Sequence, residues 1–540
     1  MNINARQLVA ECSAIASQPG ELCEYLGKTR HKSKALKMVC AANGVEYPEL
    51  LDRKWGTTAV TGRMLAVDWW KRQLKTANAR LRESEQINNL HSRVQQLKKS
   101  KNRKEKLKIG YRYVSAGTLA NHRETQRRLK DFLEAVQAVC DNGDIMPLKR
   151  IAAASVSNPV CRQAELICRL KGFEEWGIEH DMKCLFITLT CPSKYHAASA
   201  KYNRETPRQA QRYLCKVWAR FRAWLKRQEL EMHGFRMAEP HKDGTPHWHL
   251  VLWFRNGFEA LVIQNKMRQM FLGEMHPEGD RMERGASVRR VKTEILAKDE
   301  TTGKGGVLAY VLPYILKNIT GVYSDGKTTF QDKHTNLSSN AVAERAIAYA
   351  SLWRIRQFQQ IGGPSVTVWR ELRKIRGADA VEALPDIVKP LHQAADSNNW
   401  AAFIAAAEGQ DVALWTETSA DMVERLELEF GDFDAIPHNR LLPCLNAWGE
   451  PDVRRTLGVY VSGVKVKTRL HKWRIEWKRG EAAPHVPAFG TKLEIVLSRT
   501  FEELTAERRK HRQEVEETIH NAKRGAFAFQ GQSPPLDLWQ

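Results

Sequence analysis

The run of residues 239–254 constrains the fold more than any other part of the chain, because two extended segments flank a short polar turn. The turn contains Asp243-Gly244, and glycine adopts a positive φ without steric cost, so the run predicts a β-hairpin. Alternate side chains of a strand share one face of the sheet. His247 and His249 in the second strand are therefore expected to point in the same direction.

The first strand of this hairpin carries two further groups that can bind a metal. Glu239 and His241 share one face, and a loop with an odd number of residues would place them directly across from the histidines. Two imidazoles and a carboxylate that converge form a divalent-metal site with positions open for water or phosphate. We expect His247, His249 and Glu239 to be the ligands of Mg²⁺ or Mn²⁺, with His241 as a substitute ligand or a partner of one. Histidines that only satisfy local hydrogen bonds in a half-buried strand are the alternative.

A second element, residues 305–319, combines apolar side chains with two tyrosines and a lysine. It predicts a short helix, and residues four apart on a helix face nearly the same way, so Tyr310 and Tyr314 could face one target. Lys317 follows one turn after Tyr314, where its charge could lower the pKa of a phenol or hold a phosphate. Core packing is the alternative role of these tyrosines.

The elements around the hairpin predict an α+β fold. Residues 185–190 form a β-branched apolar run that ends before a proline, which is typical of a buried strand. The order of strand, helix, hairpin, helix and strand favours an antiparallel sheet of split βαβ character with helices on one face. Its expected elements are helices at 117–141, 160–176, 207–232 and 257–273 and a strand around 287–291.

Taken together, these elements resemble the HUH endonuclease superfamily. The Thr188-Leu-Thr190 strand is similar to its first motif, His247-Trp-His249 to its metal motif, and Tyr310, Tyr314 and Lys317 to its nucleophile motif. The chain looks most like the replication gene A endonuclease family of tailed phages and prophages, over residues 111–375. The segments that carry this resemblance are Phe186-Ile-Thr-Leu-Thr-Cys-Pro-Ser193, Gly234-Phe-Arg-Met-Ala-Glu-Pro-His241, Trp353-Arg-Ile-Arg-Gln-Phe-Gln359 and Gly362-Gly-Pro-Ser-Val-Thr-Val-Trp-Arg-Glu-Leu-Arg373.

The resemblance implies a site-specific nickase that initiates rolling-circle phage DNA replication. A tyrosine would attack the DNA to give a 5′-phosphotyrosyl bond and a free 3′-OH, and a later transfer would rejoin the strand without ATP. The sheet would carry the metal ligands and the helix would bring the tyrosines over them. A catalytically silent origin-binding protein, or a plasmid relaxase or transposase of the same superfamily, are the alternative functions.

One residue departs from the family pattern. Members commonly have lysine where this chain has Pro313, so only Tyr314 keeps a lysine three residues later. Proline inside a helix removes a backbone donor and clashes with the carbonyl four residues earlier, here that of Ala309. A helix that begins only at Val311 would avoid the clash but leave Tyr310 at its entrance. Tyr314 is therefore the expected first nucleophile.

The charge of the chain indicates a polyanionic partner. Lys and Arg total 85 against 62 Asp and Glu, a formal net charge of +23, and no long apolar span accompanies them. This charge favours nucleic acid over a membrane, and the family resemblance implies single-stranded or locally melted DNA as the partner, with a host helicase and polymerase. The first residues lack an apolar signal core, which predicts the cytoplasm of a bacterial host. Ten cysteines without a Cys-x-x-Cys pair argue against a structural zinc cluster and against disulfides.

Composition divides the chain into three regions. Residues 1–110 look helical and basic, residues 111–375 hold the endonuclease domain, and residues 376–540 are mixed. The last region is expected to be helical at 380–430, then to form a three-strand meander, a charged helix and a frayed tail. In the third meander strand Trp473, Ile475 and Trp477 share a face, either to stack on nucleic acid or, as the preferred interpretation, to pack internally.

Overall fold

The computed structural model describes residues 67–99, 113–273, 290–296, 306–322, 337–417 and 455–478, with short stretches between 36 and 64. Most of the basic run before residue 109, the charged helix predicted at 501–524 and the tail lie outside these residues. The chain divides into compact units Met1–Ile475 and Glu476–Gln540, and nearly all described residues belong to the first. No helix within the described ranges is long and apolar enough to cross a membrane.

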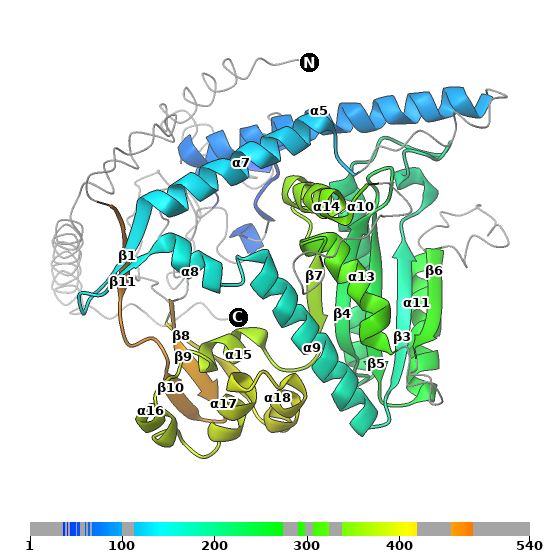
Figure 1. Ribbon diagram of the computed structural model, residues 1–540. Coiled ribbons are helices and arrows are strands. Elements are labelled where there is room, and N and C mark those ends of the chain that lie inside the picture. The colour runs from blue at the N-terminus through cyan, green and yellow to red at the C-terminus, as the bar shows by residue number, and fades with distance from the viewer. Residues whose placement is uncertain are drawn as a thin grey trace, which may run out of the picture. The chain divides into compact units, whose positions relative to one another are not determined.

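The fold is mixed α/β with several antiparallel sheets (Figure 1). The central sheet has five strands in the order β6-β3-β5-β4-β7, and every neighbouring pair is antiparallel. Its strands are β3 (Lys183–Thr190), β4 (His233–Pro240), β5 (Pro246–Phe254), β6 (Val291–Leu296) and β7 (Phe358–Ile361). The described helices are α5 (Val67–Lys99), α7 (Ala116–Ala135), α8 (Leu148–Ala154), α9 (Pro159–Glu179), α10 (Pro207–Arg227), α11 (Gly257–Gly273), α13 (Val307–Ile319), α14 (Ser339–Trp353), α15 (Val366–Leu372), α16 (Ala378–Glu382), α17 (Lys389–Asp396) and α18 (Trp400–Ala407).

The connections of the central sheet have the expected split βαβ character. β3 and β4 both pair antiparallel with β5, so they run parallel to each other with β5 between them, and α10 connects them. In the same way β5 and β6 run parallel with β3 between them, and α11 precedes β6. Two interleaved units of this kind place β5, which carries both histidines, at the centre of the sheet.

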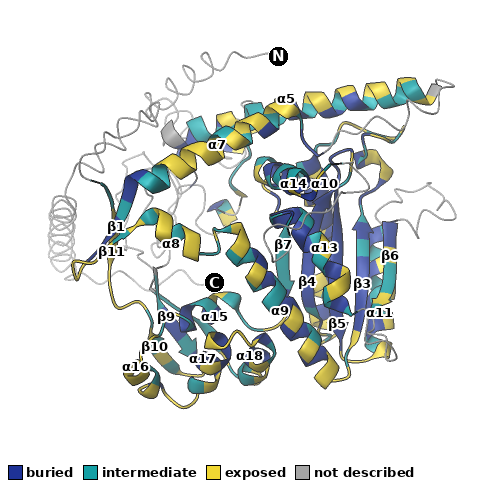
Figure 2. Cartoon of the chain, viewed as in Figure 1, coloured by how far each residue is buried: buried dark blue, intermediate teal, exposed yellow. Residues whose placement is uncertain are grey.

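The expectation that helices cover only one face of the sheet is wrong. Ile187 and Leu250 lie in a core cluster with residues of α10, α11 and α14. Phe186 and Val251 point the opposite way and pack in a second cluster with α9 and α13. The physical reason is the composition of β5, which is apolar on both faces and buried at every residue (Figure 2). A strand of this kind must be covered on both sides.

Several predicted boundaries move in the structure. The helix expected at 207–232 ends at Arg227, after a start fixed by a capping box in which Thr206 and Gln209 bond reciprocally. The helix expected at 117–141 ends at Ala135, because the chain continues as the strand β1 (Val136–Cys140). The strand expected around 287–291 corresponds to β6, which begins at Val291 and lies at the edge of the sheet. Within the helical stretch expected at 380–430, residues 412–417 form the strand β8 (Val412–Glu417).

The predicted three-strand meander is only half correct. β9 (Arg455–Val461) and β10 (Val464–Lys467) form the hairpin expected at Ser462-Gly463, but the third strand of their sheet is β8. The strand β11 (Trp473–Trp477) instead lies beside β1, in a sheet with β2 (Ile145–Pro147). Trp473 and Ile475 are 48% and 51% exposed, so the preferred interpretation of a packed face is wrong for these two residues.

The core under the histidine-bearing face extends past residue 375. It joins Phe173 of α9 to Trp369 of α15, Trp400 of α18 and Val459 of β9. Glu371 also accepts a hydrogen bond from Thr468 at 2.8 Å. The division into three functional regions at 110 and 375 stays a prediction, while the packing of this core is continuous across 375.

A glycine sets the distance between α9 and the sheet. A Cβ added at Gly177 would lie 2.5 Å from the buried ring of Trp253. We expect Gly177→Ala to lower the free energy of unfolding by about 1–3 kcal/mol, because the helix or the indole must move. Gly117→Ala in α7 is the control, since the added Cβ meets only Ser115 Oγ, at 4.0 Å. This substitution should raise the free energy of unfolding by about 0.5–1 kcal/mol. Urea unfolding measured by circular dichroism compares them, and equal midpoints would contradict the close approach.

Candidate active site

The hairpin has the register that an odd loop requires. β4 ends at Pro240 and β5 begins at Pro246, which leaves the five-residue loop 241–245. Glu239 lies directly across from His247 in the ladder. The loop is closed by a backbone hydrogen bond from the amide of His241 to the carbonyl of Thr245, at 2.7 Å. The predicted placement of the carboxylate across from a histidine is therefore observed. The same prediction is wrong for His241, because this residue lies in the loop and Met237 is the residue across from His249.

Glu239, His247 and His249 gather in a buried cluster with their ligand atoms all within 4.8 Å of one another. Each of the three residues is at most 9% exposed. His249 Nε2 lies 3.6 Å from Glu239 Oε2, while its Nδ1 is 3.1 Å from the hydroxyl of Thr188 in the predicted Thr-Leu-Thr strand. Thr188 therefore orients the imidazole so that Nε2 faces the carboxylate.

The electrostatics of the cluster suit a divalent cation. Burial alone would raise the pKa of Glu239, but the hydrogen bond with His249 and the charge of Lys317 outweigh burial and hold that pKa below its usual value. Burial and the neighbouring imidazoles hold the pKa of His247 well below its usual value, so this ring is neutral. The buried Nδ1 of His247 has no hydrogen-bond partner among the described residues. An anionic carboxylate at Glu239 and a neutral His247 ring with an unsatisfied nitrogen are groups that can bind a metal ion.

His241 lies beside this cluster rather than among its three ligand groups. Its ring stacks on His247 with the centroids 3.9 Å apart, and burial lowers its pKa to about 4. On the other side it contacts the ring of His196, 5.1 Å away. His196 in turn is 3.1 Å from Asp243 in the hairpin turn. Sequence reasoning missed His196, which stands in an irregular segment without a motif.

The tyrosine helix lies over the histidine-bearing face of the sheet (Figure 1). The ring centroids of Tyr310 and Tyr314 are 6.3 Å apart, and that of Tyr314 is 4.5 Å from His249. Phe186 of β3 contacts both phenol rings. The two phenols therefore share one face, as their spacing predicts. Tyr310 is 38% exposed.

The proline does not delay the start of this helix. α13 begins at Val307 and continues through Pro313, so Tyr310 is not at the entrance. The start is fixed by Gly306, whose φ of 91° is unfavourable for other residues, and by the carboxylate of Glu174. Glu174 accepts the amide hydrogens of Val307 at 2.8 Å and Leu308 at 3.2 Å. A carboxylate at the N-terminus of a helix accepts hydrogen bonds from backbone amides that have no partner within the helix, and its negative charge interacts favourably with the helix dipole.

The two tyrosines differ in their hydrogen-bond environment. The Tyr310 hydroxyl donates to Glu294 of β6, which also pairs with Lys292. Burial raises the pKa of Tyr310 above its usual value, and the bond to Glu294 adds to this effect. Burial and the charge of Glu239 raise the pKa of Tyr314, and Lys317 opposes them without reversing the direction. Lys317 thus lowers the pKa of Tyr314, as predicted, but its contribution is smaller than the opposing ones and the pKa stays above its usual value.

Lys317 and Asn318 connect the helix to the carboxylate. Lys317 Nζ is 3.9 Å from Glu239 Oε2. The side-chain amide of Asn318 donates to Glu239 and to the carbonyl of Tyr314, the latter at 2.8 Å. Sequence reasoning missed Asn318, Glu174 and Glu294, although a buried asparagine in an otherwise apolar helix was a readable signal for the first.

Comparisons with known proteins agree on one family. The model of the bacteriophage replication gene A protein (GPA) family matches residues 29–322. The chain is 33% identical over 428 residues to the replication gene A protein of Escherichia phage 186, which covers 77% of this chain and 56% of the relative. It is 37% identical over 301 residues to the replication protein of Haemophilus phage HP1, covering 55% and 37%.

A third relative is the probable replication endonuclease from a prophage-like region of Salmonella paratyphi A, 32% identical over 325 residues, which cover 59% of this chain and 37% of the relative. The chain thus spans 56% or less of the length of each of these three relatives. No solved structure matches the chain.

The geometry of the cluster leads to a test of metal binding. We expect the protein to bind Mn²⁺, and His247→Ala to weaken that binding by at least about tenfold, since an orienting partner alone is typically worth 10–100-fold. His180→Ala is the matched control, because this histidine lies outside the cluster. Titration followed by electron paramagnetic resonance measures free Mn²⁺. Equal affinities of the two variants would contradict the assignment.

Proposed function

Because this chain belongs to the bacteriophage replication gene A protein family, we propose that it is a replication endonuclease that nicks one DNA strand and later rejoins it. The observation that supports this proposal most directly is the position of Tyr314. Its phenol lies against His249, in a cluster of two imidazoles and a carboxylate that suits a metal ion. A nucleophile beside a cation site is the arrangement that phosphoryl transfer requires.

In the proposed reaction the Tyr314 oxygen loses its proton and forms a bond to the 5′ phosphorus of the scissile phosphodiester. The bond from phosphorus to the 3′ oxygen breaks, and that oxygen leaves as a 3′-OH after taking up a proton. One phosphodiester is exchanged for another, so a later attack by a 3′-OH can reseal the strand without ATP. His247, His249 and Glu239 would hold Mg²⁺ or Mn²⁺, and the ion would stabilise negative charge on the phosphate.

Lys317 and Glu294 would have different roles in the reaction. Lys317 pairs with the buried Glu239 and adds a positive charge next to Tyr314, where an incoming phosphate brings negative charge. Glu294 receives the hydrogen bond of Tyr310 and is therefore the group placed to accept its proton. We propose that Tyr314 makes the first cut and that Tyr310, with Glu294, acts in the second transfer.

The DNA partner follows from charge and access. A phenol on a helix needs in-line access to one strand, so the substrate would be single-stranded or locally melted. The excess of 85 Lys and Arg over 62 Asp and Glu favours contacts with phosphates. Rolling-circle initiation, extension of the 3′-OH by a host helicase and polymerase, and action inside the host cell belong to the same proposal.

The assignment of the tyrosines is tested with an oligonucleotide that contains the cleavage site. Tyr314→Phe should abolish the covalent protein–DNA adduct, because the nucleophilic oxygen is lost. Tyr310→Phe should keep the first cleavage and reduce only the second strand transfer. Tyr460→Phe, in the separate β9 sheet, serves as control. Adducts are counted by denaturing gel electrophoresis, and loss of the adduct in Tyr310→Phe alone would reverse the assignment.

The role of Glu294 gives a second test. Glu294→Gln keeps a hydrogen-bond acceptor for Tyr310 but removes a carboxylate that can take a proton. We expect the second transfer to slow by about 10²-fold or more, the usual range for a lost acid–base group, while the first cleavage stays within a few-fold. Single-turnover kinetics of each step measure the difference. An equal slowing of both steps would show that Glu294 does not serve Tyr310 specifically.

A further inference from the structure

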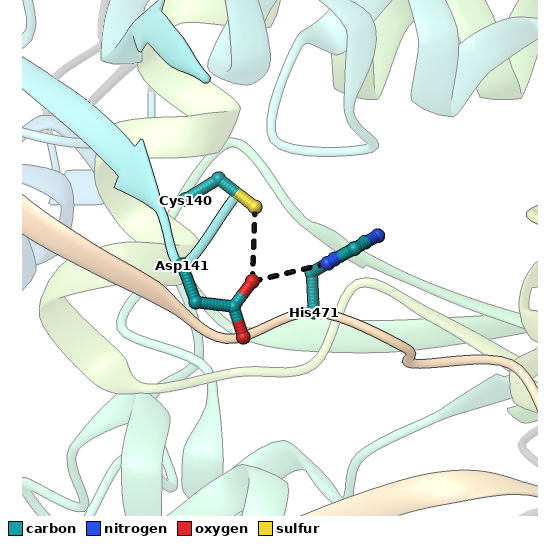
Figure 3. A group of neighbouring side chains, drawn as sticks. All are labelled: Cys140, Asp141 and His471. Carbon is teal, nitrogen blue, oxygen red and sulfur yellow. Dashed lines mark hydrogen bonds and ion pairs between the residues drawn. The ribbon is translucent and has the colours of Figure 1, made fainter. Parts of the chain in front are cut away.

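A second group of metal-binding side chains lies outside the active site. Cys140 and Asp141 end strand β1 and begin its turn, and His471 precedes β11 (Figure 3). Their ligand atoms lie within 4.8 Å of one another. Asp141 Oδ1 is 3.4 Å from the Cys140 sulfur and 3.0 Å from His471 Nδ1. Cys140 and Asp141 are neighbours in the sequence, whereas His471 lies 330 residues after Asp141.

These separations suit one tetrahedral ion. With metal–sulfur bonds near 2.3 Å and metal–nitrogen or metal–oxygen bonds near 2.0 Å, tetrahedral ligands lie about 3.5 Å apart for S and O and about 3.3 Å apart for N and O. The observed 3.4 and 3.0 Å differ from these by a few tenths of an ångström. The third pair, the sulfur and the imidazole nitrogen, lies within 4.8 Å, against about 3.5 Å in a tetrahedral site. A side-chain rotation that brings these two atoms closer would complete the geometry.

The backbone holds the carboxylate in place. The amide of Lys472 donates to Asp141 Oδ2 at 3.0 Å, and the amide of Asp141 donates to the carbonyl of Lys472 at 3.0 Å. Oδ2 is thus engaged by the chain, while Oδ1 faces both the thiol and the imidazole (Figure 3). Cys140 is 5% exposed, whereas the side chains of Asp141 and His471 are 46% and 51% exposed. Two of the three ligands are therefore accessible to solvent, while the sulfur is buried.

A catalytic thiol is a weaker explanation of the same residues. An activated cysteine needs the imidazole next to its sulfur as a base, with the carboxylate behind the imidazole. Here the carboxylate lies between the two, at hydrogen-bond distance from each. With the carboxylate between the thiol and the imidazole, the three groups fit ligands of one ion better than the parts of a proton relay.

We propose that Cys140, Asp141 and His471 bind one Zn²⁺ ion, with water as a fourth ligand. Thiolate and imidazole ligands favour Zn²⁺ over Mg²⁺, which prefers oxygen. Binding would release the proton of the Cys140 thiol. The ion would fasten the β1–β2 turn to the segment before β11 and so close a long loop of the chain. This proposal does not depend on the proposed nuclease function.

Cobalt substitution provides the test, because Co²⁺ bound by a thiolate shows a near-ultraviolet charge-transfer band. The full-length protein with Co²⁺ should show this band and the visible absorption of a tetrahedral site, and Zn²⁺ should displace both. Cys140→Ser should remove the band. Cys161→Ser should keep the band, because Cys161 is outside the proposed site. The double variant His247→Ala/His249→Ala should also keep it, because the cluster of Glu239, His247 and His249 contains no sulfur. A missing band in the wild-type protein, or one that persists in Cys140→Ser, would overturn the proposal.

Cys140→Ser changes a buried residue and could lose the band through misfolding, so His471→Ala is a second test. The side chain of His471 is half exposed, and its removal should leave the fold intact. We expect this variant to keep its circular dichroism spectrum and to bind Zn²⁺ at least about tenfold more weakly. Zn²⁺ should also raise the melting temperature of the wild-type protein but not of His471→Ala. Unchanged Zn²⁺ affinity in a folded His471→Ala protein would contradict the site.

Discussion

The pairing of Glu239 with His247 across the β4–β5 hairpin is the constraint on which the candidate site depends. Side chains alternate along a strand, so a register slip of one residue would turn His247 and His249 into the opposite core. The apolar residues of β5 prevent the slip, because Leu250 and Val251 fill different clusters on the two faces. The packing of the sheet and the position of the ligand groups are therefore determined by the same interaction.

The sequence predicted the parts of the site that follow from local periodicity. Strand alternation and the turn at Asp243-Gly244 were sufficient to place Glu239 directly across from His247, with His249 on the same face of the sheet. The four-residue spacing of the tyrosines was sufficient to put both phenols on one helix face. The order of strands and helices also gave the split βαβ topology, because that topology depends only on which elements connect which strands.

The sequence did not predict contacts that depend on tertiary packing. Glu174 caps the tyrosine helix from α9, and Glu294 binds Tyr310 from an edge strand, but neither residue stands in a local pattern that marks it. Helices on the second face were missed because the order of strands and helices does not say which face of the sheet each helix covers. Cysteine spacing argued against a zinc cluster, and local spacing cannot bring together residues that lie some 330 positions apart, as the proposed ligands Cys140 and His471 do.

Asn318 has a mechanical consequence. Its single amide group bonds both to the carboxylate of Glu239 on the sheet and to the carbonyl of Tyr314 within the helix. Tension on a strand attached to Tyr314 would act along α13 and reach the carboxylate through this amide and through Lys317. The helix and the interior strand β4 are therefore mechanically connected, so that a force on DNA attached to Tyr314, as proposed above, would also act on Glu239 in the candidate metal site.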